Sequence, residues 1–365
     1  MSPASGSVVV VGGGIVGRTA AWQLAQLGLA VCLLDPALAA GPSQGPNGSQ
    51  AALGVLMARV FHRSSGRAWR LRQRSHELWG QWLPELERRG HRLPRRSGLL
   101  LLAADADERA RQIRLADERQ RLGIPMRLLE AAALEGWQPH LPGRPLGGLL
   151  SPQDGQIDPG PLLEALLHEA RRAGASCCDE AAVALERGRR WRLTLAGGQR
   201  LDADWLVLSL GFGTEALLAG IGLALPLEPV LGQALELELA ADPGWDWPGA
   251  VVWRGMNLVP RPDLGVGGLR MWLGATLEPG RLASPAALRE LRELGGEAPG
   301  WLRQAQLVRQ WQGWRCRPAG RPAPVLEEPE PGLLLACGHY RNGVLLAPAT
   351  ADWLCKRIGG SETTG

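Results

Sequence analysis

Lysine, tyrosine and phenylalanine are scarce in this sequence. Lys356 is the single lysine, Tyr340 the single tyrosine, and phenylalanine occurs twice. Arginine therefore carries almost all of the positive charge, and 40 Lys plus Arg against 36 Asp plus Glu leave a net charge of only +4. Because this excess is small, neither a nucleic acid nor a membrane surface is indicated as a partner.

Cysteine clusters are also lacking, since the six cysteines are scattered without a CxxC pair or a Cys/His group. This argues against a zinc site or a disulfide framework, so we expect no metal and a reducing compartment. No apolar run approaches the roughly 20 residues that a bilayer requires, and no basic region precedes the first strand. We therefore expect a cytoplasmic protein. No Ser/His/Asp or Cys/His grouping offers a nucleophile, and we predict no catalytic side chain.

A chain of 365 residues that is 45% hydrophobic and 21% charged suits a globular protein of two domains. Hydrophobic periodicity predicts a strand, a helix and a second strand at the N-terminus, and a strand followed by a helix at the C-terminus. Antiparallel strands are expected between these ends. The predicted helices are Ile15–Leu27, Arg67–Arg89, Ala106–Leu122, Pro161–Ala173 and Gly343–Ile358; the strands are Ser7–Val11, Leu29–Leu34, Ser97–Leu102, Leu201–Ser209, Leu231–Leu239, Val251–Pro260, Met271–Ala275, Arg309–Trp314 and Gly332–Cys337; Gly41–Gly48 and Ser151–Gly155 are expected as loop and turn.

The glycine cluster after the first strand forms a G-x-G-x-x-G pattern at the start of a helix. Gly12 permits the tight turn, Gly14 lets a pyrophosphate approach the backbone, and Gly17 lets the helix pack closely on the sheet. The phosphates would bind the unpaired amides at the positive end of the helix dipole. Asp35 ends the second strand, where a carboxylate can accept hydrogen bonds from a ribose. This pattern predicts a bound dinucleotide and does not separate FAD from NAD.

A second glycine-marked junction lies near the C-terminus, between the strand that ends at Cys337 and the helix that begins at Gly343. A nicotinamide enzyme has no need of it. A reduced flavin gains negative charge on its pyrimidine ring, which the N-terminus of this helix would stabilise. An ordinary helix start capped by Asn342 or Gly343 is the alternative interpretation.

At these residues the sequence resembles the glycine and D-amino-acid oxidase superfamily, and within it the thiamine-pathway glycine oxidases. Gly338–Thr350 is similar to the C-terminal flavin motif of that family. Weaker resemblances follow in the same order and spacing, so that the similarity extends from about Val8 to Ile358. They are Pro152–Gly155 with Asp158–Pro159, Ala203–Leu208, Val259–Arg261 and Gly274–Thr276.

The resemblance implies an α/β fold: a Rossmann-like FAD-binding domain with an inserted α+β substrate domain that carries an antiparallel sheet. The FAD-binding domain would comprise residues 1–60, 152–222 and 325–358, the substrate domain 61–151 and 223–324, and residues 359–365 would be a disordered tail. FAD is the implied cofactor. Its adenine end would contact Gly12, Gly14, Ile15, Val16, Gly17, Asp35, Pro36 and the backbone at Val183, and its isoalloxazine ring would contact Gly48, Ser49, Leu53, Gly54, Val55, His339, Arg341, Asn342, Gly343, Val344 and Leu345.

The implied reaction transfers a hydride from the α-carbon of a small amino acid to the flavin, and oxygen then takes the electrons. The substrate carboxylate needs a charge-assisted donor, preferably bidentate, and Arg315 occupies the family's position for it. Arg341 and Asn257 are further substrate contacts, and Arg317 is the alternative to Arg315. This sequence departs from the family pattern at Cys316, where a proline is usual, and at Asn257, where a tyrosine is usual. Covalent flavin attachment at Cys316 is not expected.

Three other possibilities stay open from the sequence. A flavin dehydrogenase of the same fold would pass electrons to an acceptor other than oxygen. A flavin-dependent tRNA-modifying enzyme could use the arginines between Arg59 and Arg74, although on a helix these face several directions. Association of identical subunits is also left open.

Overall fold

The computed structural model describes residues 6–38, 48–241, 244–264 and 268–360. The predicted loop Gly41–Gly48 lies outside these ranges except for Gly48, and so does the predicted tail from residue 361. Gly359, which was predicted to belong to that tail, is instead the last residue of the C-terminal helix α9 (Gly343–Gly359).

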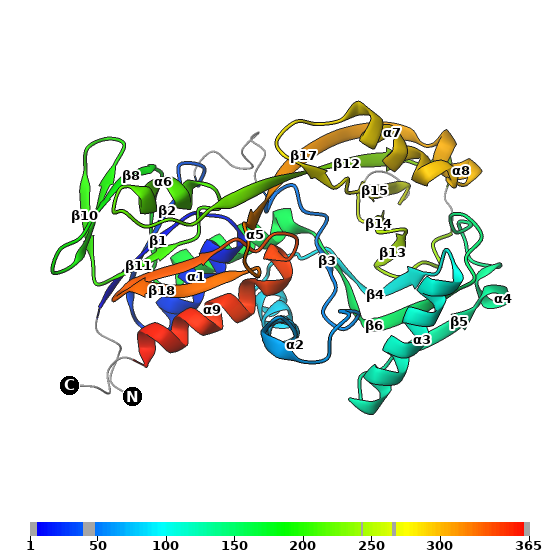
Figure 1. Ribbon diagram of the computed structural model, residues 1–365, viewed down its shortest axis with the longest axis horizontal. Helices are drawn as coiled ribbons and strands as arrows, with labels where there is room; N and C mark the ends of the chain where they lie inside the picture. Colours follow the sequence, from blue (N-terminus) through cyan, green and yellow to red (C-terminus); the bar gives the residue numbers. More distant parts are fainter. Residues whose placement is uncertain (1–5, 39–47, 242–243, 265–267, 361–365) are drawn as a thin grey trace.

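A six-stranded sheet carries the two glycine-marked junctions in the described part of the chain (Figure 1). Val8 and Val10 of its central strand point to one face, while Val9 and Val11 point to the other, because strand side chains alternate. Helices α1 (Ile15–Gln26), α5 (Pro159–Arg172) and α9 cover the first face. The strand order is β18 (Val325–Glu330), β19 (Leu333–Cys337), β11 (Trp205–Leu208), β1 (Ser7–Val11), β2 (Ala30–Leu34) and β7 (Ser176–Cys178), with β18 alone antiparallel to its neighbour.

The opposite face of this sheet is covered by a small sheet that the sequence patterns did not reveal. Trp191 and Leu193 pack there with Val9 and Val11. Helix α6 (Gly213–Ala219) completes this side. The three strands are β8 (Ala182–Glu186), β9 (Trp191–Leu195) and β10 (Arg200–Ala203).

A larger, mostly antiparallel sheet forms the other half of the molecule, and the long strands β12 (Leu227–Glu238) and β17 (Gln306–Pro318) extend into it from the first half (Figure 1). Strand β17 pairs with β12 over nearly its whole length. The remaining strands are β16 (Glu278–Pro279), β15 (Arg270–Gly274), β14 (Met256–Arg261), β13 (Ala250–Trp253), β4 (Arg95–Leu102), β6 (Gly147–Ile157), β3 (Val55–Leu56) and β5 (Arg127–Glu130). The predicted fold class, an α/β cofactor-binding unit joined to an antiparallel sheet, is confirmed.

Of the remaining α-helices in the described residues, one packs on the helices of the first half and four flank the second half. Helix α2 (Gly66–Arg88) buries the predicted apolar side, and Trp82 meets Trp22 of α1 edge to face at 5.4 Å. Trp79 donates a hydrogen bond from Nε1 to the carbonyl of Val344, which ties α2 to the start of α9. The others in the described residues are α3 (Ala106–Arg121), α4 (Ala131–Leu134), α7 (Pro285–Glu293) and α8 (Gly300–Gln304).

The turn predicted at Ser151–Gly155 is wrong, because β6 continues through these residues, with a bulge in its pairing with β4. Gly155 serves close strand packing instead, since a β-carbon there would lie 2.3 Å from the carbonyl oxygen of Arg96. The Asp154 side chain points into the protein and accepts hydrogen bonds from the backbone amides of residues 58–60. Turn-forming residue types were thus used for contacts with distant segments.

Two predicted strands are divided in the structure. Leu201–Ser209 breaks at Asp204, whose carboxylate accepts a hydrogen bond from the Ser7 amide at 2.8 Å, and its two parts join different sheets. Val251–Pro260 is a hairpin, β13 and β14, with Arg254 and Gly255 both at positive φ in its turn. No helix in the described part of the chain combines the length and the apolar character needed to span a membrane. The predicted domain boundaries stay a prediction.

Candidate cofactor and substrate cavity

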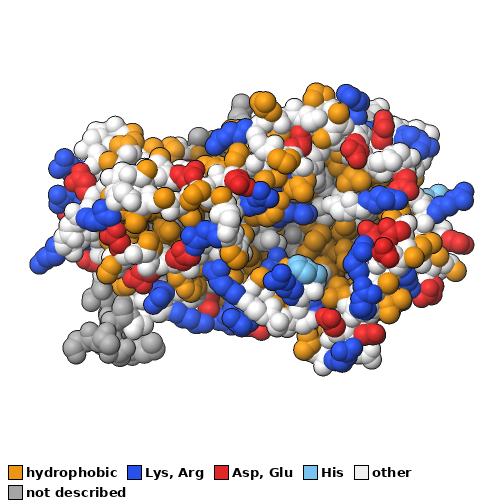
Figure 2. All heavy atoms as spheres, in the orientation of Figure 1, with side chains coloured by type: hydrophobic (Ala, Val, Ile, Leu, Met, Phe, Trp, Pro, Cys, Tyr) orange, Lys and Arg blue, Asp and Glu red, His pale blue; other side chains and the backbone are white. Residues whose placement is uncertain are grey.

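A cavity of about 1090 Å³ runs from the first glycine-rich turn, past the carboxyl ends of β1, β11 and β19, to the large sheet. Figure 2 shows the face hollowed between α2 below and the large sheet above, with apolar atoms inside the hollow. Most of the predicted site residues line this cavity. They are Gly12, Gly14, Ile15, Val16, Asp35, Gly48, Ser49, Leu53, Gly54, Val55, Asn257, Arg315, His339, Arg341, Asn342, Gly343, Val344 and Leu345.

The first turn depends on glycine for two different reasons. Gly12 has φ of +110°, and a β-carbon there would lie 2.6 Å from the carbonyl oxygen of Ser209. Gly17 packs one turn into α1, where a β-carbon would lie 1.8 Å from the carbonyl oxygen of Gly12. Gly17 does not line the cavity, and its position agrees with the predicted role in close packing of the helix.

The N-terminus of α1 is suited to an anion. Its N-cap is Gly14, which has no side chain, and its first turn contains no acid. The Ile15 amide donates to Ser49 Oγ at 3.0 Å. Asp35 accepts hydrogen bonds from the Gly13 and Ala37 amides at 2.7 and 2.8 Å, which fixes its carboxylate at the cavity wall. Phosphates at the helix end and a ribose at Asp35 fit this arrangement.

The second junction presents another helix N-terminus to the same cavity. Gly338 and Tyr340 have φ of +63° and +54°, and Asn342 is the N-cap of α9 without a side-chain hydrogen bond. His339 is buried and shares a 2.8 Å hydrogen bond with Thr350 through Nε2. Burial lowers the pKa of His339 to about 3, so its ring is neutral near pH 7. The helix dipole, and not this histidine, supplies positive potential here.

Arg315 of β17 is held over the cavity by two backbone carbonyls. Its Nη1 donates to Leu231 at 3.1 Å and to Thr276 at 3.0 Å. Burial, followed by the nearby charge of Arg341, lowers the pKa of Arg315 to about 10. Among the described residues no acid forms an ion pair with either arginine. Arg315 is therefore still charged at neutral pH, and with Arg341 nearby this end of the cavity is suited to a carboxylate.

Asn257 supplies an acceptor at the same end. Its Nδ2 donates to the carbonyl of Gly274 at 3.1 Å, which fixes the orientation of the amide because a carbonyl can only accept. Its Oδ1 is buried and has no hydrogen-bond partner in the described structure. An amine of a bound ligand would satisfy this oxygen.

Arg317, the alternative carboxylate residue, is excluded from the cavity. It is exposed and pairs with Glu228 on the neighbouring strand, with Nε and Oε2 3.0 Å apart. Pro36 and Val183 also do not line the cavity, and Val183 lies on β8 with 57% of its surface exposed.

The sequence analysis missed two segments of the cavity wall. Ser209–Phe212 follows β11, which pairs with β1, so its place beside the glycine-rich turn could have been inferred from the sheet order. The second segment joins the loop after β3 to α2 and includes Phe61 and Arg72. No sequence pattern marks it, because these residues reach the cavity only when α2 packs on α9. Further residues missed are Met57, Val60, His62, Gly232, Met256, Thr276, Leu277, Glu290 and Trp314.

Comparison with known proteins identifies the family. Residues 7–357 match the model of a family described as FAD dependent oxidoreductase. The chain belongs to this family. It is similar to glycine oxidase of Pseudomonas putida, with 30% identity over 98% of this chain and 96% of that protein, and to glycine oxidase of Geobacillus kaustophilus, with 28% identity over 98% and 93%. The crystal structure of the Geobacillus protein has a TM-score of 0.85 to this chain over 99% of this chain and 96% of that one, at 27% identity.

A further relative is a bifunctional protein ThiO/ThiG of Synechocystis, which is 29% identical over 94% of this chain and 50% of that protein. As an FAD-dependent oxidoreductase, the chain must hold a long dinucleotide with adenine at one end, a pyrophosphate in the middle and a flavin at the other end. The N-termini of α1 and α9 both line the cavity and lie side by side, since a β-carbon on Gly343 would be 3.7 Å from Cγ2 of Ile15, so that they can face the pyrophosphate and the flavin. The residues present therefore fit FAD.

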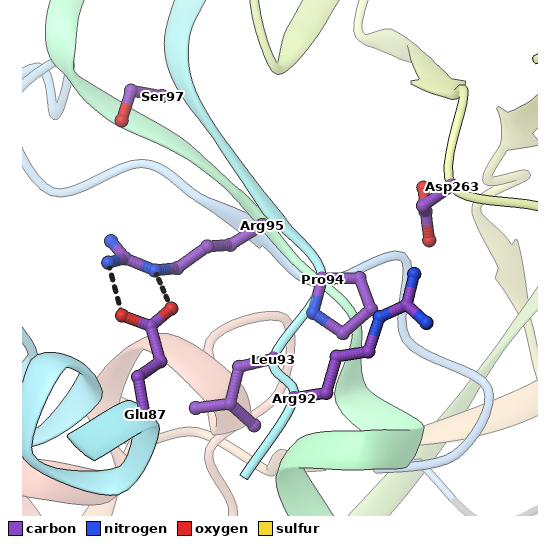
Figure 3. Close-up of a pocket in the computed structure, with 7 residues that line it drawn as sticks. All are labelled: Glu87, Arg92, Leu93, Pro94, Arg95, Ser97 and Asp263. Atoms are coloured by element: carbon purple, nitrogen blue, oxygen red, sulfur yellow. Dashed lines mark hydrogen bonds and ion pairs between the residues drawn. The ribbon is translucent and has the colours of Figure 1, made fainter. Parts of the chain in front are cut away.

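A smaller pocket of about 470 Å³ lies apart from this site and shares no lining residue with it (Figure 3). Arg95 and Glu87 form a bidentate ion pair at one side of it. Asp263, at the other side, accepts a hydrogen bond from Arg261 at 2.9 Å. Glu87, Arg95 and Asp263 are thus already paired, and we assign no ligand to this pocket.

Two other groups in the described chain carry side chains that can bind a metal or act as a nucleophile. His91, His168 and Glu169 bring possible metal ligands within 4.8 Å of one another, a cluster that the sequence did not reveal. The carboxylate of Glu169, however, already accepts hydrogen bonds from Arg89, Arg172 and His91. Cys316 lines the cavity, but burial raises its pKa to about 12, so a thiolate for covalent attachment is disfavoured.

Proposed function

We propose that this protein oxidises the amine of a small amino acid, with glycine or sarcosine as the first candidates, and reduces oxygen to hydrogen peroxide. The observation that carries the proposal is Arg315, a partly buried guanidinium without an acidic partner in the described structure, fixed at the end of the cavity where the second helix N-terminus lies. The similarity to proteins named glycine oxidase supports the same substrate class.

The reaction balances without a side-chain nucleophile. Glycine, oxygen and water give glyoxylate, ammonium and hydrogen peroxide, by way of an imine that water hydrolyses. Bound FAD supplies the acceptor for the hydride that leaves the α-carbon. The lone pair of the neutral amine assists loss of the hydride from the α-carbon. The main task of the protein is therefore to hold the substrate in the orientation that reacts.

Each polar group at the flavin end has a proposed task. Arg315 binds the carboxylate through the part of the guanidinium that its carbonyl contacts leave open, and Arg341 adds positive potential from the rim of the cavity. Asn257 accepts a hydrogen bond from the amine through Oδ1. The N-terminus of α9 stabilises negative charge that develops on the ring system.

The test begins with the visible spectrum of the purified protein, which should show bound FAD. Anaerobic titration with a panel of small amino acids should then bleach the flavin, and air should restore it with one equivalent of peroxide per amine oxidised. Bleaching followed by slow recovery in air would instead identify a dehydrogenase with another acceptor. A protein that is not bleached by any amino acid would refute the proposal.

Partners and location are part of the same proposal. We propose an amino acid and oxygen as the reactants, a cytoplasmic location, and delivery of the imine to thiazole formation for thiamine, as in the pathway of the resembling enzymes. The arginines considered for RNA do not form one exposed strip: Arg72 is buried, Arg67 donates to the carbonyl of Pro324, and Arg74 pairs with Asp352. This arrangement favours the amino acid over tRNA.

A further inference from the structure

Arg72, on the first half of α2, is a second buried arginine in the cavity wall, and the reaction proposed above makes no use of it. Only 9% of its surface is exposed. Its Nη1 donates to the carbonyl of Ala68 on its own helix at 3.1 Å, whereas its buried Nε has no hydrogen-bond partner in the described structure. No described acid pairs with it.

A guanidinium in this environment is a buried positive charge that no acid among the described residues neutralises. Burial lowers the pKa of Arg72 to about 10, so the group is still protonated at neutral pH. A buried ion is costly unless it is paired, and one face of this ion already rests on the Phe61 ring, with Cζ 3.8 Å from the ring centre. The open donors remain for a ligand in the cavity.

The surroundings of Arg72 are rigid. The backbone amides of residues 58, 59 and 60 all donate to the buried carboxylate of Asp154. Arg119, which has no exposed surface, donates to the carbonyls of Arg59 and Phe61 from the other side. The loop that carries Phe61 is therefore held in place before any ligand binds, which is the arrangement of a prepared binding site.

We propose that Arg72 binds a second anionic group of the substrate, so that the preferred substrate class is an amino acid or N-substituted glycine with two carboxylates. This inference rests on the proposed function: Arg315 takes the carboxylate next to the reacting carbon, and Arg72 takes the distal one. The loop after β3 and helix α2 then select the substrate, while β17 positions the amine for oxidation.

The test uses the FAD-loaded protein and ligands that cannot be oxidised. Acetate and a series of diacids from malonate to adipate are titrated while the flavin absorbance is followed. We expect at least one diacid to bind more tightly than acetate. Since a hydrogen bond to a charged group is worth about 1.5 to 3 kcal/mol, Arg72→Met should weaken that diacid about ten- to a hundredfold and change acetate binding less than about threefold.

Arg72→Lys should recover part of the selectivity, and Arg70→Met, at an exposed position of the same helix, should leave it unchanged. The comparison of acetate with diacids on the unaltered protein needs no variant. It therefore tests the preference for diacids even if Arg72→Met does not fold. Equal affinity for acetate and every diacid would overturn the inference. An equal loss of both in Arg72→Met, or an altered flavin spectrum without ligand, would also overturn it, because Arg72 would then support the flavin.

Oxidation assays separate this inference from the proposed function. We expect iminodiacetate, D-aspartate or D-glutamate to be oxidised with a higher kcat/KM than glycine, and Arg72→Met to reverse that order. Oxidation of glycine without any diacid preference would leave the proposed function intact and refute the inference. Diacid binding that depends on Arg72, in a protein that oxidises no amine, would support the inference about Arg72 and refute the proposed function.

Discussion

The guanidinium of Arg315 lies against the backbone of Gly232 on the neighbouring strand. A β-carbon built on that glycine would be 2.2 Å from Nη2 and 2.5 Å from Cζ of the arginine. The obstructing atoms belong to the end of a flexible side chain, so a larger residue at position 232 would displace Arg315 without breaking the sheet. Gly232 thus sets the position of the proposed carboxylate donor.

We predict that Gly232→Ala keeps its FAD but binds acetate and amino acids about ten- to a hundredfold more weakly, a loss of roughly 1.4 to 2.8 kcal/mol. The dissociation constants come from absorbance titrations of the flavin. Gly80→Ala is the matched control, since a β-carbon at Gly80 on α2 meets nothing within 4 Å. Normal ligand affinity in Gly232→Ala would show that Arg315 tolerates displacement and that its present position is not required.

Arg315→Ala should lower kcat/KM by a factor of about 30 to a few thousand, because removing one partner of a buried charge pair costs about 2 to 5 kcal/mol. The flavin content should stay near normal, and Arg315→Lys should restore only part of the activity. Arg317→Ala should be close to the unaltered enzyme, since Arg317 is paired with Glu228 outside the cavity. Steady-state kinetics of both variants on the best amino acid show which arginine binds the carboxylate. A larger loss of kcat/KM in Arg317→Ala than in Arg315→Ala would refute the assignment to Arg315.

Gly14→Val should fold but lose FAD. Gly14 has φ of −71°, which any residue adopts, and its nearest obstacle is Ser49 Oγ at 3.0 Å, so the added side chain occupies cavity space that the pyrophosphate needs. The ratio of flavin absorbance to protein absorbance measures the loss. Gly12→Ala should instead reduce soluble yield, because its β-carbon would meet backbone at 2.6 Å. Full flavin occupancy in Gly14→Val would mean that the turn is only structural.

We predict that Glu169 makes a pH-dependent contribution to the free energy of unfolding. Burial raises its pKa, but hydrogen bonds from His91, Arg89 and Arg172 outweigh burial and lower the pKa to about 2. Because this value is below that of an unfolded glutamate, about 4.3, the contribution is complete above pH about 4.3 and is lost as the pH falls toward 2.

Glu169→Gln should therefore reduce the free energy of unfolding at pH 7 by up to about 3 kcal/mol, and the difference between the two proteins should shrink as the pH falls below about 4.3 and be nearly lost at about pH 2. Urea unfolding at several pH values measures the difference. Glu164→Gln, at an exposed position of the same helix, should have little effect at any pH. A Glu169→Gln deficit that persists undiminished at pH 3 would contradict the proposed electrostatic origin.

The sequence by itself determined both glycine-marked junctions, and with them the two helix N-termini that line the cofactor cavity. Gly12 and Gly17 could be recognised because their roles are local: a positive φ and close contact within one turn depend on neighbours in the chain. The amphipathic side of α2 was predicted for the same reason, since helical periodicity is a property of one segment.

Only the tertiary structure decided which polar residues reach the cavity. Arg315 and Arg317 are both arginines on one strand, yet packing buries the first over Gly232 and leaves the second with Glu228 at the surface. Arg72 and Asp154 looked like a helix surface residue and a turn residue. Burial of such groups depends on contacts between segments far apart in the chain, here α2 with α9 and β6 with the loop after β3, and local sequence patterns do not encode those contacts.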